Sequence, residues 1–317
     1  MQGRLVTVFG GSGFIGRYIV KRLAAKGARV RVATRDPEGA KFLKPMGAVG
    51  QVAPFKVSIG NADSIRVAVE GSDAVVNLVG ILSEGGRQSF RMAHVQGPEN
   101  IATAASDAGI QNMVHVSAIG ADGDSASAYA RSKFLGEEAV RSAIPESVIL
   151  RPSVVFGPED DFFNRFAAMA RMAPALPLVD GGKTKFQPVY VGDVADAVMA
   201  ALENEGASGK TYELGGPEVL SFKTLLEYIL SETGRSRALV PVPAPFLKPL
   251  AAIMEFLPAP PLTRDQLILL RKHNVVDDGA LKLADLGLDA TAIAAEVPDY
   301  LVRFRNQGQY TNYKQAD

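Results

Sequence analysis

Residues 10–16 place glycines at a spacing that can hold a phosphate group. The run reads Gly-Gly-Ser-Gly-Phe-Ile-Gly, with an apolar stretch at residues 5–9 before it and a helical pattern at residues 14–26 after it. Glycines permit a tight turn, let backbone N–H groups approach a pyrophosphate at a helix amino terminus, and let the helix pack closely on the strand. A merely flexible turn is the alternative reading. The strand, turn and helix context favours a dinucleotide-binding loop.

The residues that end the second predicted strand bear on the choice of nucleotide. A site selective for NAD usually carries a carboxylate there, whereas this chain reads Ala-Thr-Arg-Asp at residues 33–36. The guanidinium of Arg35 suits a ribose 2′-phosphate, so the sequence favours NADP over NAD. Two alternatives stay open: Asp36 accepts from the ribose instead, or Arg35 is an ordinary surface residue.

A tyrosine and a lysine stand four residues apart at Tyr129 and Lys133, hence on one face of a predicted helix. A neighbouring ammonium favours the phenolate form, which a general acid or base in hydride chemistry needs. Spacing alone is weak evidence, because Tyr310 and Lys314 share it in a polar tail. Tyr129 gains weight because it lies downstream of a predicted strand that runs into Ser117.

Short β-branched runs alternate with longer helical patterns through the first half of the chain, which predicts a parallel sheet with helical crossovers. The predicted strands are residues 5–9, 30–34, 55–57, 74–79, 113–116 and 148–150. Two predicted helices, residues 14–26 and 97–108, each end before a glycine, Gly27 and Gly109. The fold class is therefore α/β, a doubly wound Rossmann-type sheet, with a smaller, mainly helical carboxyl-terminal lobe.

Composition excludes several classes of protein. The 317 residues carry 34 Lys and Arg against 34 Asp and Glu, and this balance argues against a nucleic-acid binder. There is no cysteine, so disulfides and thiolate zinc sites are excluded, and the three histidines, His94, His115 and His273, have no metal-ligand spacing. We expect ordinary structural or surface histidines and no metal. We also expect no cleaved signal peptide and no membrane-spanning helix.

These features resemble the short-chain dehydrogenase/reductase superfamily in its extended, epimerase-like or atypical branch. The resemblance covers most of the chain and includes Asn-Leu-Val-Gly at residues 77–80, Arg-Pro-Ser-Val-Val-Phe-Gly-Pro at 151–158 and Pro-Val-Tyr-Val-Gly-Asp-Val-Ala at 188–195. It implies that the first segment lines the cofactor, the second passes the nicotinamide and the third supports the substrate lobe. Because the strand and helix pattern loosens after Arg151, we expect domains at 1–150 for NADP(H) and 151–303 for a mixed lobe interleaved with the sheet, followed by a polar tail at 304–317.

The chain departs from the pattern of active members of that branch. The catalytic hydroxyl expected just after the fifth strand falls on Ser117, one position early, with Ala118 after it, and the loop from Ser117 to Tyr129 is short. The acidic residue expected near adenine is replaced by Ser58 and Ile59. Tyr129 and Lys133 are therefore expected to bind ribose without a complete catalytic set.

A finer resemblance is to the nucleotide-binding accessory subunit of respiratory complex I (NADH:quinone oxidoreductase), in its bacterial form. It rests on Gly-Pro-Glu-Asp-Asp-Phe-Phe-Asn-Arg-Phe at residues 157–166 and Phe-Gln-Pro-Val-Tyr at 186–190. The resemblance implies a tightly bound NADPH, no turnover, and docking on the peripheral arm beside other complex I subunits near the quinone site. It implies a peripheral location on the cytoplasmic face of the bacterial inner membrane.

The two readings share one set of residues. The residues expected to contact the cofactor are Gly10, Gly11, Ser12, Gly13, Phe14, Ile15, Gly16, Thr34, Arg35, Ser58, Leu78, Val79, Gly80, Ser117, Tyr129, Lys133, Pro152 and Val154. If the protein is instead an active NAD(P)-dependent oxidoreductase or sugar-nucleotide epimerase or dehydratase, Tyr129 is the acid/base, Lys133 its activator and Ser117 the substrate donor. A regulator that binds partners in one redox state of the cofactor is a third hypothesis.

Residues 235–274 carry a local net charge of +4, from six basic and two acidic residues interleaved with apolar ones. Such a mixture suits anionic lipid headgroups or a partner groove. An ordinary lobe helix with its apolar face in the core explains it equally well.

Overall fold

The computed structural model describes residues 1–86, 88–255, 257, 260 and 262–305. The predicted polar tail lies almost wholly outside the described residues. The chain forms two compact units, each built from three segments. Unit 1 comprises Met1–Pro152, Val191–Gly215 and Val276–Asp289, and unit 2 comprises Ser153–Tyr190, Gly216–Val275 and Ala290–Asp317.

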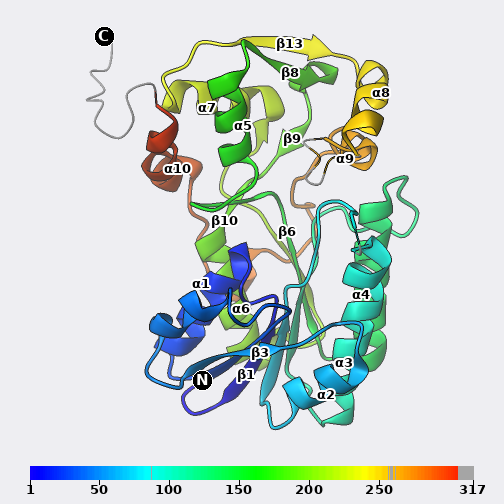
Figure 1. Ribbon diagram of the computed structural model, residues 1–317, viewed down its shortest axis with the longest axis vertical. Helices are drawn as coiled ribbons and strands as arrows, with labels where there is room; N and C mark the ends of the chain where they lie inside the picture. Colours follow the sequence, from blue (N-terminus) through cyan, green and yellow to red (C-terminus); the bar gives the residue numbers. More distant parts are fainter. Residues whose placement is uncertain (87, 256, 258–259, 261, 306–317) are drawn as a thin grey trace. The chain divides into compact units, whose positions relative to one another are not determined.

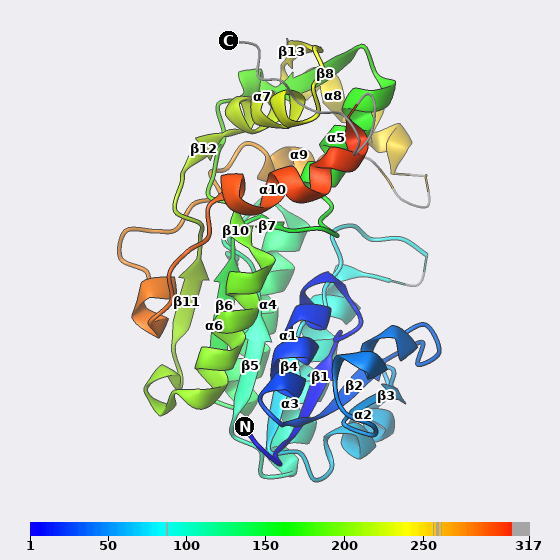
Figure 2. The same cartoon turned by 90° about the vertical axis from the view of Figure 1, so that its left-hand side faces the viewer.

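Unit 1 is a seven-stranded parallel sheet with helices on both faces. Its strands are β1 (Leu5–Phe9), β2 (Arg29–Thr34), β3 (Val52–Lys56), β4 (Ala74–Asn77), β5 (Met113–Val116), β6 (Val148–Pro152) and β11 (Thr211–Leu214). They lie in the order β11-β6-β5-β4-β1-β2-β3, as Figure 2 shows. The strand order reverses between β1 and β4, and a doubly wound sheet binds ligands at the carboxyl ends of its strands beside such a point. The predicted Rossmann-type fold is confirmed.

Two layers of helices cover this sheet (Figure 1). One layer holds α1 (Phe14–Ala25) and α6 (Val191–Glu203), and the other holds α2 (Ala62–Val69), α3 (Gly97–Asp107) and α4 (Ala128–Ala143). A π-helical turn, Arg91–Gln96, precedes α3, and 3₁₀ turns occur at Lys41–Met46, Glu205–Ala207 and Leu283–Leu286. Because both faces are covered, the strands are nearly continuous apolar runs. Val6, Val8, Val75 and Val76 have no exposed surface.

Several predicted element bounds need correction; the helix predicted at residues 97–108 ends at Asp107, and the strand predicted at 148–150 runs to Pro152. The strand predicted at residues 74–79 ends at Asn77, because Asn77 Oδ1 accepts a hydrogen bond from Val79 N at 3.1 Å and turns the chain. The strand predicted at residues 55–57 runs from Val52 to Lys56 and contains Pro54, which is tolerated because β3 is the edge strand. The helix predicted to end at Lys26 ends at Ala25, and Gly27 follows in the left-handed conformation at φ +79°.

Unit 2 is mainly helical. Its helices are α5 (Phe163–Met172), α7 (Phe222–Glu232), α8 (Ala244–Met254), α9 (Arg264–Leu269) and α10 (Ile293–Leu301), with 3₁₀ turns at Asp180–Gly182 and Val302–Phe304. Short strand pairs link β7 (Val155–Phe156) with β10 (Val189–Tyr190), β8 (Ala175–Val179) with β13 (Ala238–Val242), and β9 (Lys185–Phe186) with β12 (Leu220–Ser221). Its core is rich in phenylalanine: Phe156, Phe163, Phe186 and Phe222 are buried together.

A buried carboxylate organises the start of α5 in unit 2. Asp160 accepts hydrogen bonds from the backbone of Gly157, Phe162 and Asn164 and from the Tyr300 hydroxyl, the last at 2.7 Å. Burial raises the pKa of Asp160, and the four hydrogen bonds oppose that rise. The Gly-Pro-Glu-Asp-Asp-Phe-Phe-Asn run therefore has a structural task within unit 2, which is to fasten α10 to the loop before α5.

Candidate functional site

The glycine loop joins β1 to α1 as predicted. Gly10 has φ +78°, and a Cβ there would lie 3.2–3.3 Å from the backbone of Leu78 and Val79. A Cβ on Gly16 would lie 2.4 Å from Gly10 O, so only glycine lets α1 rest on the loop. Gly13 is the N-cap of α1 and no side chain caps the helix, which leaves its first N–H groups available to a pyrophosphate.

The loop also meets the end of β2, where the adenosine ribose is expected. Ser12 Oγ donates to Thr34 Oγ1 at 3.3 Å. Arg35 is exposed, whereas the Asp36 carboxylate accepts a hydrogen bond from Gly39 N at 3.0 Å. Asp36 is thus partly committed to its own turn. Ser58, after β3, is exposed and its backbone pairs with Ser64 at the start of α2.

The segment after β4 lies directly beside the glycine loop. Leu78 N donates to Phe9 O at 2.9 Å, which brings residues 78–80 to the carboxyl end of β1. Gly80 lies against the side chains of α4 and the π-helical turn, because a Cβ there would be in van der Waals contact with His94 Nε2 at 3.6 Å and Lys133 Nζ at 3.9 Å. Leu78, Val79, Gly80 and the glycine loop therefore form one continuous edge.

Helix α4 presents the tyrosine and lysine. Ser127 caps the helix by accepting from Ala130 N, and Lys133 is 5% exposed with its Nζ donating to Val116 O at 3.0 Å. The lysine is thus fastened to the end of β5, beside Gly80. Tyr129, one turn earlier, is partly exposed and lies edge-on to the rings of Phe90 and His94, with ring centroids 5.7 and 5.3 Å away.

Ser117 follows β5, and its backbone N–H donates to Leu150 O at 2.7 Å. The residue is 4% exposed, and its hydroxyl has no hydrogen-bond partner among the described residues. The backbone therefore continues the sheet, while the hydroxyl is closed off from solvent. A buried hydroxyl in this position is poorly placed to donate to a substrate.

Two histidines lie in the site, although their spacing in the sequence did not predict it. His94, on the π-helical turn, accepts from Ile81 N at 3.0 Å through Nε2. Its Nδ1 must then carry the proton and donate to Ser132 Oγ at 2.8 Å. Burial first, and the Lys133 charge second, lower the pKa of His94 to about 3, so the ring is neutral.

His115 on β5 is likewise buried, and its Nδ1 accepts from Asn77 Nδ2 at 3.0 Å. Burial and then Lys133 lower its pKa well below the ordinary value. Both histidines are hydrogen-bonded and uncharged inside unit 1. Both nevertheless line the surroundings of Lys133, so they belong to the site.

Lys133 is perturbed as well, since burial lowers its pKa to about 8 while Glu137 opposes that fall. Glu137 lies one helical turn beyond Lys133, is 3% exposed, and makes a bidentate pair with Arg151 at 2.9 and 2.6 Å. The i, i+4 spacing of Tyr129, Lys133 and Glu137 was the signal in the sequence that could have identified Glu137.

The last two predicted residues fall in different units. Pro152 ends β6 in unit 1, is buried, and accepts from Ile119 N at 3.0 Å. Val154 belongs to unit 2, where its N–H donates to Asn274 Oδ1 at 3.1 Å.

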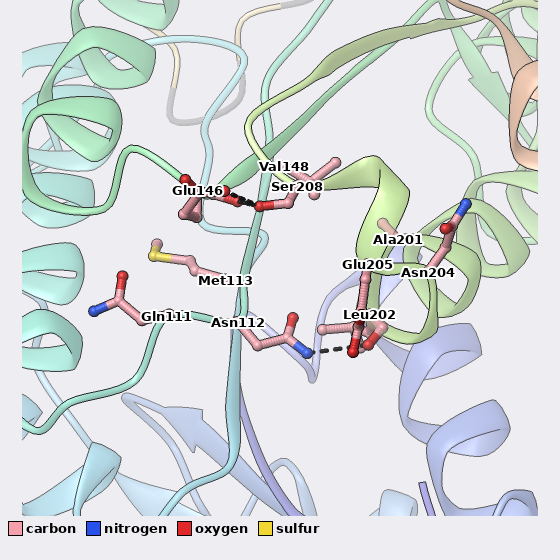
Figure 3. Close-up of a pocket in the computed structure, with 10 residues that line it drawn as sticks. All are labelled: Gln111, Asn112, Met113, Glu146, Val148, Ala201, Leu202, Asn204, Glu205 and Ser208. Carbon is pink, nitrogen blue, oxygen red and sulfur yellow. Dashed lines mark hydrogen bonds between the residues drawn. The ribbon is translucent and has the colours of Figure 1, made fainter.

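A cavity of about 400 Å³ in unit 1 is separate from this site (Figure 3). Met113 and Val148, the first residues of β5 and β6, line it together with Glu146 and Ser208, which hydrogen-bond to each other. It therefore opens at the amino end of the parallel strands, whereas the glycine loop follows their carboxyl end. Position excludes it as the dinucleotide site.

The chain belongs to the NAD dependent epimerase/dehydratase family, whose model matches residues 6–215. It is 38% identical to NADH dehydrogenase [ubiquinone] 1 alpha subcomplex subunit 9 of Arabidopsis thaliana over 320 residues, which cover 97% of this chain and 80% of that protein. The subunit of the same name from Mus musculus is 36% identical over 308 residues, covering 96% and 81%. The expected resemblance to this subunit family is confirmed.

Solved structures agree on the fold. A dTDP-glucose 4,6-dehydratase from Streptomyces venezuelae, determined with NAD bound, superposes with a TM-score of 0.71 at 21% identity, covering 96% of this chain and 98% of that one. The family is described as NAD dependent, and the uncapped helix, the glycine cradle and the buried lysine fit that kind of ligand. A nicotinamide dinucleotide is therefore the cofactor class that the family and the site support.

Proposed function

We propose that this protein is an accessory subunit of an NADH:quinone oxidoreductase of the complex I type that holds NADPH without turning it over. The observation that carries the proposal is 38% identity along nearly the whole chain to a subunit of that enzyme, together with an intact glycine loop in unit 1. A ligand that binds only the folded state stabilises it by mass action, so a tightly held nucleotide has a structural benefit.

The preference for NADPH rests on the residues that follow β2. Arg35 is exposed at the position where a 2′-phosphate is expected, and Thr34 with Ser12 offers hydroxyls beside it. The carboxylate of Asp36 is engaged by Gly39 N, which favours Arg35 as the group that meets the ribose.

The absence of turnover is supported by Ser117. A substrate donor must be reachable, and this hydroxyl is closed off from solvent at 4% exposure of the residue. Tyr129 and Lys133 then act as ribose-binding residues. A nicotinamide supplies hydride transfer in active members of such families, and the serine expected to orient a substrate for it, Ser117, is buried here.

Docking is assigned to α8 in unit 2 and its neighbours, within residues 235–274. Phe246, Leu250 and Ile253 stand at i, i+4 and i+7 and are 76, 45 and 69% exposed, which makes an apolar stripe on one face. Such a stripe suits the boundary between headgroups and acyl chains. No described helix is long and apolar enough to cross a membrane, and we propose a peripheral position on the cytoplasmic face of the bacterial inner membrane, beside the subunits near the quinone site.

The direct experiment is purification from membranes of a strain carrying an affinity tag on the chromosomal copy. The proposal predicts copurification with NADH:quinone oxidoreductase subunits after mild detergent extraction. Replacing Phe246 and Ile253 by serine should lower the yield of the complex on the tag, whereas the same change at exposed Val67 in unit 1 should not. A tagged protein that elutes alone from intact membranes contradicts the proposal.

An active oxidoreductase or epimerase is the second candidate, and one observation favours it: Lys133 has a pKa of about 8 and lies one turn from Tyr129. That reading predicts turnover of NADPH with a small carbonyl or a nucleotide sugar, abolished by Tyr129→Phe. If Tyr129→Phe instead leaves quinone reduction by the complex unchanged and no such turnover is found, the structural role stands.

A further inference from the structure

Four charged side chains follow one another inside unit 1, and ion pairs join the last three of them. Lys133 and Glu137 are one turn apart on α4, and Glu137 pairs with Arg151 on β6. Arg151 in turn lies 3.7 Å from a carboxylate oxygen of Glu213, its register partner on the neighbouring strand β11. The other carboxylate oxygen of Glu213 accepts from Asp277 N at 3.0 Å. The signs alternate along the row and sum to zero.

Burial of these four charges carries a desolvation penalty that lowers the stability of the fold. Lys133, Glu137 and Glu213 are 5, 3 and 5% exposed, and the Arg151 side chain is 23% exposed. Replacing a buried ion pair by apolar residues is often neutral or favourable for stability, so the fold itself does not require charges here. A buried, charge-balanced row that ends on a ligand-binding lysine instead suggests a task at that lysine.

Among the described residues around Lys133, Glu137 is the only carboxylate whose charge raises the pKa of Lys133. The other polar groups that face Lys133 carry no charge: His94 from the π-helical turn, His115 from β5, and the Val116 carbonyl. Both histidines remain neutral because of their burial, so they add no further positive charge beside the lysine. Arg151 fixes the Glu137 carboxylate by two parallel hydrogen bonds.

We propose that Glu137, one turn from Lys133 and also paired with Arg151, is a positioning residue that keeps Lys133 as an ammonium for the bound nucleotide. This inference rests on the proposed nicotinamide dinucleotide site. The ammonium donates hydrogen bonds to ribose hydroxyls, whereas a neutral amine beside Gly80 would do so more weakly. The row thereby connects the far edge of the sheet, at β11, to the cofactor.

The test is a titration of Lys133 in the full-length protein by NMR of ¹³Cε-labelled lysine, with Lys133→Met used to assign its signal. Glu137→Gln should lower the midpoint by about one pH unit or more, because it removes the opposite charge nearby. Arg151→Met should raise the midpoint, because it removes the cation that competes for Glu137. Both variants break the same buried pair, so general damage predicts the same direction for the two. Glu138→Gln, an exposed neighbour on α4, should leave the midpoint unchanged.

A second readout is NADPH affinity as a function of pH. Wild-type affinity should fall as pH rises through about 8, and in Glu137→Gln the fall should begin at a correspondingly lower pH. Midpoints that move in the same direction in Glu137→Gln and Arg151→Met, or that do not move, overturn the inference. If wild type binds NADPH and Lys133→Met weakens binding but Glu137→Gln keeps the wild-type pH profile, the inference fails while the proposed function stands. If wild type binds neither NADPH nor NADH, the proposed function fails, and the nucleotide half of the inference fails with it.

Discussion

Replacing Lys133 by methionine should stabilise the nucleotide-free protein. Burial lowers the lysine pKa from 10.5 to about 8. This pKa difference of about 2.5 lowers the free energy of unfolding at pH 7 by about 3 kcal/mol. The variant also loses the hydrogen bond from Nζ to Val116 O, which lowers its stability by about 1 kcal/mol. The net expectation is a variant about 2 kcal/mol more stable than wild type at pH 7.

The stability difference between the two proteins should depend on pH. Between pH 8 and 10.5 the unfolded chain binds more protons at Lys133 than the folded chain does, so wild-type stability rises with pH in that window. The penalty is fully present below pH 8 and is gone above 10.5. The advantage of Lys133→Met should therefore shrink by about 3 kcal/mol between pH 7 and 10.5.

Urea unfolding of both proteins across that pH range, followed by circular dichroism, measures the difference. Lys210→Met, at an exposed position in unit 1, is the matched control and should show no such trend. A Lys133→Met variant that is less stable than wild type at pH 7, by an amount that does not change up to pH 10.5, would show that burial of the lysine charge does not destabilise the folded protein. The expected result means that Lys133 lowers the stability of the nucleotide-free protein, as is common for residues of a functional site.

Three further predictions concern the loop, the nucleotide and unit 2. Gly16→Ala should weaken nucleotide binding at least about tenfold by fluorescence titration, since its Cβ would lie 2.4 Å from a backbone oxygen, whereas Gly279→Ala, with open space around it, should not. Arg35→Ser should weaken NADPH binding about tenfold or more, as expected for a lost charge-assisted hydrogen bond, and change NADH binding little; an equal loss for both nucleotides contradicts the 2′-phosphate assignment. Tyr300→Phe should cost about 1–3 kcal/mol in urea unfolding, because it removes a hydrogen bond from the buried Asp160 carboxylate, and an unchanged midpoint would show that this bond is dispensable.

Local features of the site were predictable from the sequence. The glycine loop needs only a strand, a turn and a helix in succession, and all of these are adjacent in the chain. The face shared by Tyr129 and Lys133 follows from helix periodicity alone. The end of β4 was missed because it depends on a side-chain hydrogen bond from Asn77, which a run of apolar residues conceals.

Non-local features were not predictable. His94 and His115 meet around Lys133 because a π-helical turn and a central strand converge there, and their separation in sequence gives no sign of it. Glu213 joins Arg151 only because the chain returns to unit 1 and adds β11 as a seventh strand. Periodicity in a window of residues carries no information about such a return.

The central claim is that this protein holds a nucleotide within a quinone-reducing complex without consuming it. The most direct measurement is the amount and identity of nicotinamide dinucleotide released by acid from the tagged, purified complex, before and after many turnovers with NADH and quinone. We expect about one NADP(H) per copy of this protein, unchanged by turnover. Release of no NADP(H), or a bound nucleotide whose redox state follows each turnover, would contradict it.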